Sequence, residues 1–175
     1  MGKYQMVNFN GDAREQALDI IYNITEQGAY ANIILEKSLK KSHLASQDRH
    51  LITEIVNGTI RMLKHLDWVL NLFLKMPIEK QNPWLRNILR MSLYQLRFMD
   101  KIPAYAAVNS AVELTNKKAG KKLAPVCNGV LRSIMRNPDK IRSAHGPPDQ
   151  NLYCPNPLLP KAPRGNIPPR HYSPS

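Results

Sequence analysis

The chain has little of what most catalytic and metal sites require, beginning with cysteine. Only two of its 175 residues are cysteines, Cys127 and Cys154, and they lie in separate segments. They support neither a disulfide framework nor a zinc site of clustered thiolates, so we expect a reducing, cytoplasmic location. The five histidines are scattered without the i, i+4 spacing of metal ligands, and we expect no metal site.

Long apolar runs and glycine-rich loops are also missing. No stretch of about 18 apolar residues could cross a bilayer, and the N-terminus lacks the apolar core of a signal peptide. The eight glycines never fall in a G-x-G-x-x-G arrangement, and no alternating strand pattern of useful length occurs. We therefore expect no membrane partner, no dinucleotide-binding domain and no bound cofactor.

What the chain does have is positive charge and a proline-rich end. Nine of the 14 prolines lie in residues 143–175, a composition that cannot bury enough apolar surface to offset chain entropy. We expect a flexible N-terminus over residues 1–11, a folded domain over 12–142 and a disordered tail over 143–175. The chain without its tail keeps 22 Lys+Arg and 12 Asp+Glu, a formal charge of +10. Such a charge favours polyanionic partners, nucleic acid before anionic membrane surface.

Apolar residues recur at helical spacing in about seven segments of residues 12–142, which predicts an all-α bundle. Gly28 is expected to end the first helix, Asp12 and Glu15 to form a capping box, and Asp67 to cap the fourth helix. The expected helices are Ala13–Gln27, Tyr30–Lys41, one opening at Ser46, Trp68–Lys75, Pro83–Met99, one opening at Pro103, and one that carries Val126 and Ile134 and closes at Asn137-Pro138.

The helix expected over Pro83–Met99 is apolar around most of its circumference, which places it in the middle of the bundle. Arg86, Arg90 and Arg97 fall within one narrow stripe of it. We interpret this stripe as the only solvent-facing edge of the helix. Direct contact of these arginines with phosphate is the alternative.

Three segments resemble a known family. They read NGTIR at 57–61 followed by LDW at 66–68, ILRMSLYQL at 88–96 followed by IPAYAAVNSAVEL at 102–114, and NGVLR at 128–132. These segments resemble the NusB-like RNA-binding domain, most of all the N-terminal domain of the RsmB-type ribosomal RNA cytosine-5 methyltransferases. The LDW triplet, Tyr94-Gln95, the IPAY tetrapeptide and Arg132 favour this branch over free-standing NusB, the transcription antitermination protein.

The resemblance implies a NusB-like bundle that binds structured RNA and, in the longer proteins, delivers ribosomal RNA to a catalytic domain that uses S-adenosylmethionine. Nothing after Arg142 resembles that domain, and Cys154 lies in a proline-rich coil that cannot hold a catalytic geometry. We therefore expect a chain truncated before the catalytic domain, and no enzyme by itself. The alternatives are a free-standing antitermination factor that binds leader RNA and a ribosomal protein, and a chain that is itself an active methyltransferase.

Two basic regions are the candidate RNA contacts. The resemblance implies one at the N-terminal helix, where Lys3 and Arg14 lie. The other is the densest basic region of the chain, a turn around Gly120 together with two arginines one helical turn apart. Its residues are Lys117, Lys118, Lys121, Lys122, Arg132 and Arg136. Phosphate contacts of this kind position RNA and make the affinity for RNA depend on salt. The alternative interpretation of the turn around Gly120 is a loop that only aids solubility.

Overall fold

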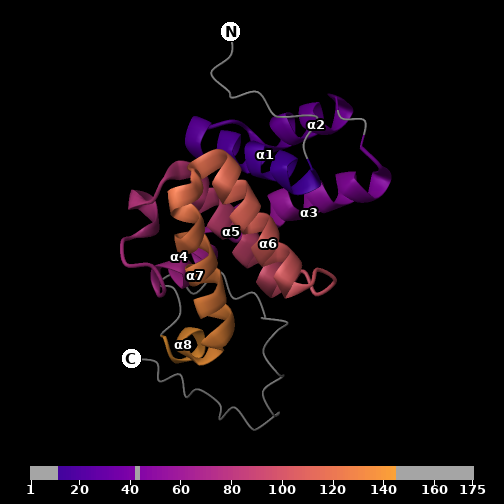
Figure 1. The fold of residues 1–175 in the computed structure, drawn as a ribbon. Coiled ribbons are helices and arrows are strands. Elements are labelled where there is room, and N and C mark those ends of the chain that lie inside the picture. Colours follow the sequence, from indigo (N-terminus) through magenta and orange to yellow (C-terminus); the bar gives the residue numbers. More distant parts are fainter. Residues whose placement is uncertain (1–11, 42–43, 145–175) are drawn as a thin grey trace, which may run out of the picture.

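A computed structural model describes residues 12–41 and 44–144 of the chain. These residues form eight α-helices and no strand, so the predicted all-α class is confirmed (Figure 1). The expected flexible segment 1–11, with Lys3, and residues 145–175 of the expected tail 143–175 lie outside the described residues. The helices are α1 (Ala13–Gln27), α2 (Ala31–Lys41), α3 (Ser46–Arg61), α4 (Leu63–Asn71), α5 (Pro83–Phe98), α6 (Ala104–Leu114), α7 (Ala124–Arg136) and α8 (Pro138–Ser143).

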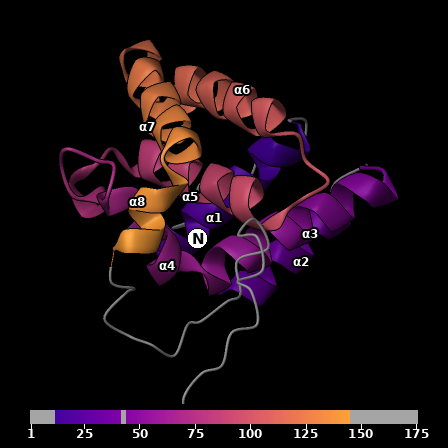
Figure 2. The same ribbon diagram turned by 90° about the horizontal axis from the view of Figure 1, so that it is seen from below.

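The helix α5 runs through the middle of the bundle, as its apolar sequence predicts. Figure 2 shows it surrounded by α1, α3, α4, α6 and α7. Its side chains Leu85, Ile88 and Leu89 are fully buried, and burial of a side chain of this size contributes about 1.5–3 kcal/mol. Among the described residues, none of the helices combines the length and the apolarity that crossing a membrane requires.

Two helix ends follow the local sequence signals. Gly28 ends α1 with a φ of 70°, a left-handed conformation that glycine adopts at little cost. Asn82 opens α5, because its side-chain oxygen accepts hydrogen bonds from the backbone N–H groups of Trp84 at 2.9 Å and Leu85 at 3.3 Å. Pro83 occupies the first position of α5. A backbone N–H at this position has no acceptor within the helix, so its absence in proline costs no hydrogen bond.

Two predicted caps are wrong. Asp12 precedes α1 but makes no side-chain cap, and Glu15, its expected partner, turns inward and binds Lys117 at 2.6 Å. Asp67 was expected to open a helix over Trp68–Lys75, yet it lies inside α4. Its carboxylate binds Arg90, because a buried guanidinium needs a nearby anion more than an exposed helix end needs a cap.

The arginines of α5 do not form the expected solvent-facing edge, because Arg90 is 7% and Arg97 8% exposed. Arg90 donates from Nε and Nη2 to the two carboxylate oxygens of Asp67 in α4, at 2.7 and 2.8 Å. Arg86 donates from Nε to Glu26 of α1 at 2.8 Å. Carboxylates from neighbouring helices therefore compensate two of these cations inside the bundle.

Candidate nucleic-acid interface

The connection between α6 and α7 carries four of the candidate lysines. The chain leaves α6 through a π-helical turn, Thr115–Ala119, and enters α7 through a short 3-10 turn, Lys121–Leu123. Gly120 joins the two turns with a φ of 102°, a conformation that residues with a side chain rarely adopt. The change of direction at Gly120 separates Lys117 and Lys118 from Lys121 and Lys122.

The first two lysines face acidic side chains of α1. Lys117 Nζ lies 2.6 Å from Glu15 Oε2, and Lys118 Nζ lies 2.7 Å from Asp19 Oδ1. Glu15 is only 5% and Asp19 only 3% exposed, so these carboxylates require nearby cations. Lys118 also lies 5.0 Å from the centre of the Trp84 ring. In this structure Lys117 and Lys118 therefore hold α1 against the α6–α7 connection.

The other two lysines remain available to a partner. Lys121 and Lys122 are exposed, and neither forms a salt bridge within the described residues. They lie in the 3-10 turn just before α7, the helix that carries Arg132 and Arg136. Both arginines are exposed as well, and within the described residues no carboxylate pairs with either. Arg132 donates from Nε to the side-chain oxygen of Asn128, at 3.0 Å.

Arg14 is placed differently from the cations of α7. It lies near the start of α1, is partly buried, and donates from Nε to Gln95 Oε1 in α5 at 2.9 Å. Gln95 in turn donates to the backbone oxygen of Met91 at 3.2 Å. The structure does not bring Arg14 together with the basic residues of α7, and its guanidinium is oriented by a neutral amide.

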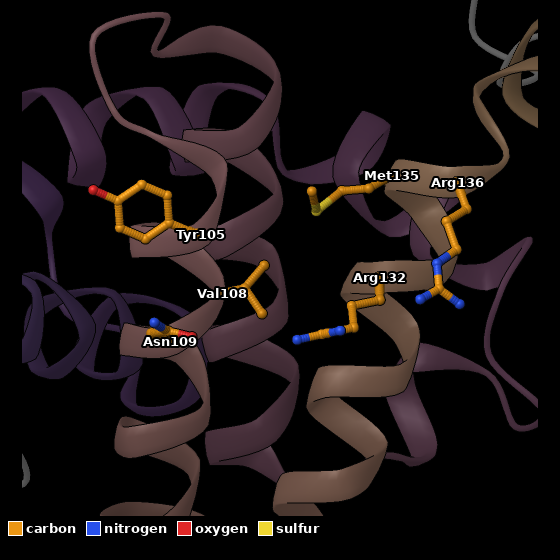
Figure 3. Close-up of a pocket in the computed structure, with 6 residues that line it drawn as sticks. All are labelled: Tyr105, Val108, Asn109, Arg132, Met135 and Arg136. Atoms are coloured by element: carbon orange, nitrogen blue, oxygen red, sulfur yellow. The ribbon is translucent and has the colours of Figure 1, made fainter.

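A shallow groove lies between α6 and α7, and Arg132 and Arg136 form part of it (Figure 3). Its volume is about 210 Å³. Figure 3 shows Arg132 reaching from α7 across the groove towards Val108 of α6. Sequence reasoning nominated the two arginines from their charge but missed the residues that complete the lining. The complete lining is Tyr105, Val108 and Asn109 from α6, and Arg132, Met135 and Arg136 from α7.

The described residues offer no reactive thiol. Cys127 of α7 is fully buried, and burial raises the pKa of its thiol to about 11, so the thiol stays protonated at neutral pH. The expectation that Cys127 is a small apolar residue of the last long helix agrees with this position. Cys154 lies outside the described residues. No group of three or more potential metal-ligating side chains occurs within residues 12–41 and 44–144.

Comparison with known proteins gives two kinds of similarity. The model of the NusB family matches residues 11–136. In sequence, the chain is 40% identical over 123 residues to a Bacillus subtilis protein named probable ribosomal RNA small subunit methyltransferase B. It is 39% identical over 124 residues to the Synechocystis protein of the same name. An Escherichia coli ribosomal RNA small subunit methyltransferase B is 29% identical over 146 residues.

The matched part is most of this chain and a minor part of those proteins. It covers 70% of this chain and 27% of the Bacillus relative, and 71% and 28% for the Synechocystis relative. For the Escherichia coli relative the shares are 83% and 33%. The chain thus spans about 30% of the length of the methyltransferases that it resembles.

Solved structures share the fold over nearly their whole length. The antitermination factor NusB, solved with NusE and double-stranded RNA, superposes with a TM-score of 0.65 at 21% identity, covering 75% of this chain and 98% of that one. The solution structure of NusB from Aquifex aeolicus gives a TM-score of 0.63 at 20% identity, covering 80% and 95%. At this identity the likeness establishes the arrangement of helices.

Proposed function

The chain belongs to the NusB family, and from this premise we propose that it is the RNA-binding part of a small-subunit ribosomal RNA methyltransferase. The observation that carries the proposal is the identity of about 40% to relatives named small subunit methyltransferase B, against 21% to NusB of the NusB–NusE complex. The charge of the chain agrees with an RNA partner, and so do Arg132 and Arg136 of α7, which pair with no carboxylate among the described residues.

In this proposal the chain binds RNA and transfers no methyl group itself. Attack on cytosine needs an activated thiolate, and the one cysteine of the described residues is buried and protonated. The described helices also offer S-adenosylmethionine no glycine-rich loop between a strand and a helix. We assign to the exposed cations Lys121, Lys122, Arg132 and Arg136 the contact with RNA.

A binding assay against salt tests this proposal. Fluorescence anisotropy of the full chain with labelled fragments of small-subunit ribosomal RNA should give an affinity that falls steeply between about 50 and 200 mM salt. Large-subunit fragments and an unrelated hairpin serve as controls, and we expect weaker binding to both. Absence of RNA binding at every salt concentration contradicts the proposal.

The same assay distinguishes the proposed function from the alternative, a transcription antitermination factor. Preference for a transcript leader over small-subunit ribosomal RNA, strengthened by a ribosomal protein, would favour an antitermination factor. The solved complex of NusB with NusE and double-stranded RNA is the reason to include a leader transcript and a ribosomal protein. The 21% identity of that NusB to this chain establishes the fold alone. Incubation with labelled S-adenosylmethionine and ribosomal RNA should leave the RNA unlabelled if the chain has no methyltransferase activity.

A further inference from the structure

We propose that the groove between α6 and α7 binds one unpaired nucleotide of the RNA, with the base inside the groove and a phosphate on Arg136. This inference rests on the proposed RNA-binding function and specifies which kind of RNA element the site recognises. It concerns the six lining residues of Figure 3, which the sequence does not reveal as a unit.

The size of the groove restricts its occupant. Its volume of about 210 Å³ lies below the roughly 300 Å³ at which pockets for drug-sized ligands begin. A single flat ring can enter, whereas a helix of either protein or RNA cannot. The rim is open to solvent, since Tyr105 is 71% and Met135 46% exposed.

The lining matches the two halves of a nucleotide. Val108 of α6 and Met135 of α7 are apolar parts of the lining, and Tyr105 lies at its outer edge on α6, where Figure 3 shows the ring directed away from α7. Arg132 extends its guanidinium across the groove towards Val108. Unpaired RNA bases stack on aromatic rings and on guanidinium planes, and Asn109 offers an amide for the edge of the base. Such a base must already be free of its helix, because a paired base does not present its faces.

The charge of the groove selects a polyanion. Arg136 lies one helical turn after Arg132, and neither arginine has a carboxylate partner within the described residues. Three cations at other helix contacts, Arg86, Arg90 and Lys118, are paired with carboxylates. The tail of this chain carries three basic residues and one acidic residue, so its charge does not complement the groove. The phosphate of a bound RNA carries the opposite charge and therefore complements the groove.

The experiment compares a stem–loop RNA with a fully paired duplex of the same stem, each carrying 2-aminopurine in place of one adenine. For the stem–loop the label lies in the loop. The full chain is tested as wild type and as Tyr105→Ala, Tyr105→Phe and Arg132→Gln. Tyr105 is exposed, so Tyr105→Ala should keep the fold, which circular dichroism checks. Lys121→Gln is the matched control, because it also removes one cation but lies in the turn before α7, at the other end of that helix and outside the groove.

We expect the wild type to bind the stem–loop more tightly than the duplex and to change the 2-aminopurine fluorescence of the loop. Tyr105→Ala should weaken stem–loop binding about 5- to 150-fold, the span expected for loss of one base–aromatic stack, and leave duplex binding unchanged. Tyr105→Phe should retain the wild-type preference because the ring remains. Arg132→Gln should reduce the same preference, whereas Lys121→Gln should weaken stem–loop and duplex equally.

The remaining outcomes contradict either the nucleotide site or the proposed function, and they tell the two apart. If the chain binds RNA but Tyr105→Ala behaves as wild type, or the duplex binds as tightly as the stem–loop, the groove is not a nucleotide site and the proposed function stands. If the wild type binds neither RNA, the proposed function fails first. Binding of poly-glutamate that depends on Tyr105, without binding of RNA, would reassign the groove to an acidic protein segment.

Discussion

Gly58 of α3 lies directly against the aromatic ring of Tyr94 in α5. A Cβ on residue 58 would overlap the Tyr94 ring at Cζ and at its hydroxyl oxygen. Tyr94 cannot move aside easily, because it is 5% exposed and its ring stacks on Phe98 with the centroids 5.3 Å apart. The close approach of α3 to α5 therefore depends on the missing side chain of Gly58.

Replacement of Gly58 by alanine should destabilise the domain by about 1–3 kcal/mol, because overpacking outweighs the better helix propensity of alanine. Gly129 of α7 is the matched control, since a Cβ there meets nothing within 4 Å. Gly129→Ala should stabilise the domain by roughly 0.5–1 kcal/mol. Urea unfolding of both variants measures the difference, and equal effects of the two substitutions would rule out the steric explanation.

Acid should weaken the contact between α1 and α5 through Glu26. Burial alone would raise the pKa of Glu26, but hydrogen bonds from Arg86 and Asn87 outweigh it and lower the pKa below the ordinary 4.5. Because the folded pKa is depressed, the stabilisation is complete above pH 4.5 and is lost as the pH falls through the folded pKa. Glu26→Gln should cost about 1–3 kcal/mol at neutral pH.

Thermal unfolding from neutral to acidic pH checks this prediction. The melting temperature of the wild type should fall more steeply in the acid range than that of Glu26→Gln, so the two curves should converge. Glu54→Gln is the control, because Glu54 is exposed on α3. Parallel curves for wild type and Glu26→Gln would show that Glu26 has the same pKa in the folded and unfolded states.

The buried cation Arg97 should make the domain less stable than an apolar side chain of similar size at the same position would. Arg97 is 8% exposed, its Nε has no hydrogen-bond partner among the residues that the structure describes, and burial lowers its pKa. Burial and the charge of Arg97 together lower the pKa of His65. Arg97→Met should therefore raise the pKa of His65 towards 6.5, although burial keeps it lower, and should stabilise the domain by about 1 kcal/mol or more.

An NMR titration of the His65 ring and urea unfolding measure the two effects of Arg97→Met. Arg61→Met is the control, since Arg61 is exposed at the end of α3 and should change stability by less than about 0.5 kcal/mol. An unchanged His65 pKa together with lower stability would mean that the guanidinium of Arg97 makes a favourable interaction that its removal breaks.

The four lysines around Gly120 should divide into two functional pairs. Lys121→Gln with Lys122→Gln should reduce the dependence of RNA affinity on salt by about one to two phosphate contacts and leave stability unchanged. Lys117→Gln with Lys118→Gln removes the same charge but should cost about 1–3 kcal/mol of stability, because it leaves the carboxylates of Glu15 and Asp19 without these partners. Anisotropy against salt and urea unfolding compare the two double variants. The reverse pattern would mean that RNA displaces Glu15 and Asp19.

The sequence predicts the features of this fold that are local. Gly28 and Asn82-Pro83 mark helix ends through backbone preferences that need no tertiary contact, and the apolar circumference of α5 indicates its central place. The ion pairs are not local. Asp67 and Arg90 are 23 residues apart, so a pattern within one helix shows an arginine or an acid but not the pairing. Both wrong caps and the misassigned arginine stripe have this cause.

The candidate site divides in the same way. Charge alone nominated Arg132 and Arg136, and their role in RNA binding stays a prediction. Tyr105, Val108 and Met135 become part of a site only through the relative position of α6 and α7, which no spacing within either helix encodes. Tyr105 occurs in the sequence segment that resembles the family, and that segment was the only signal that could have pointed to it.

The contacts of Lys117 and Lys118 with α1 have a consequence for protein synthesis. They join positions 102 and 99 residues apart, so at about 5–20 residues per second the acids of α1 leave the ribosome roughly 5–20 s before the lysines. A nascent chain that stalls before residue 117 therefore contains Glu15 and Asp19 without the two lysines that contact them in the finished domain.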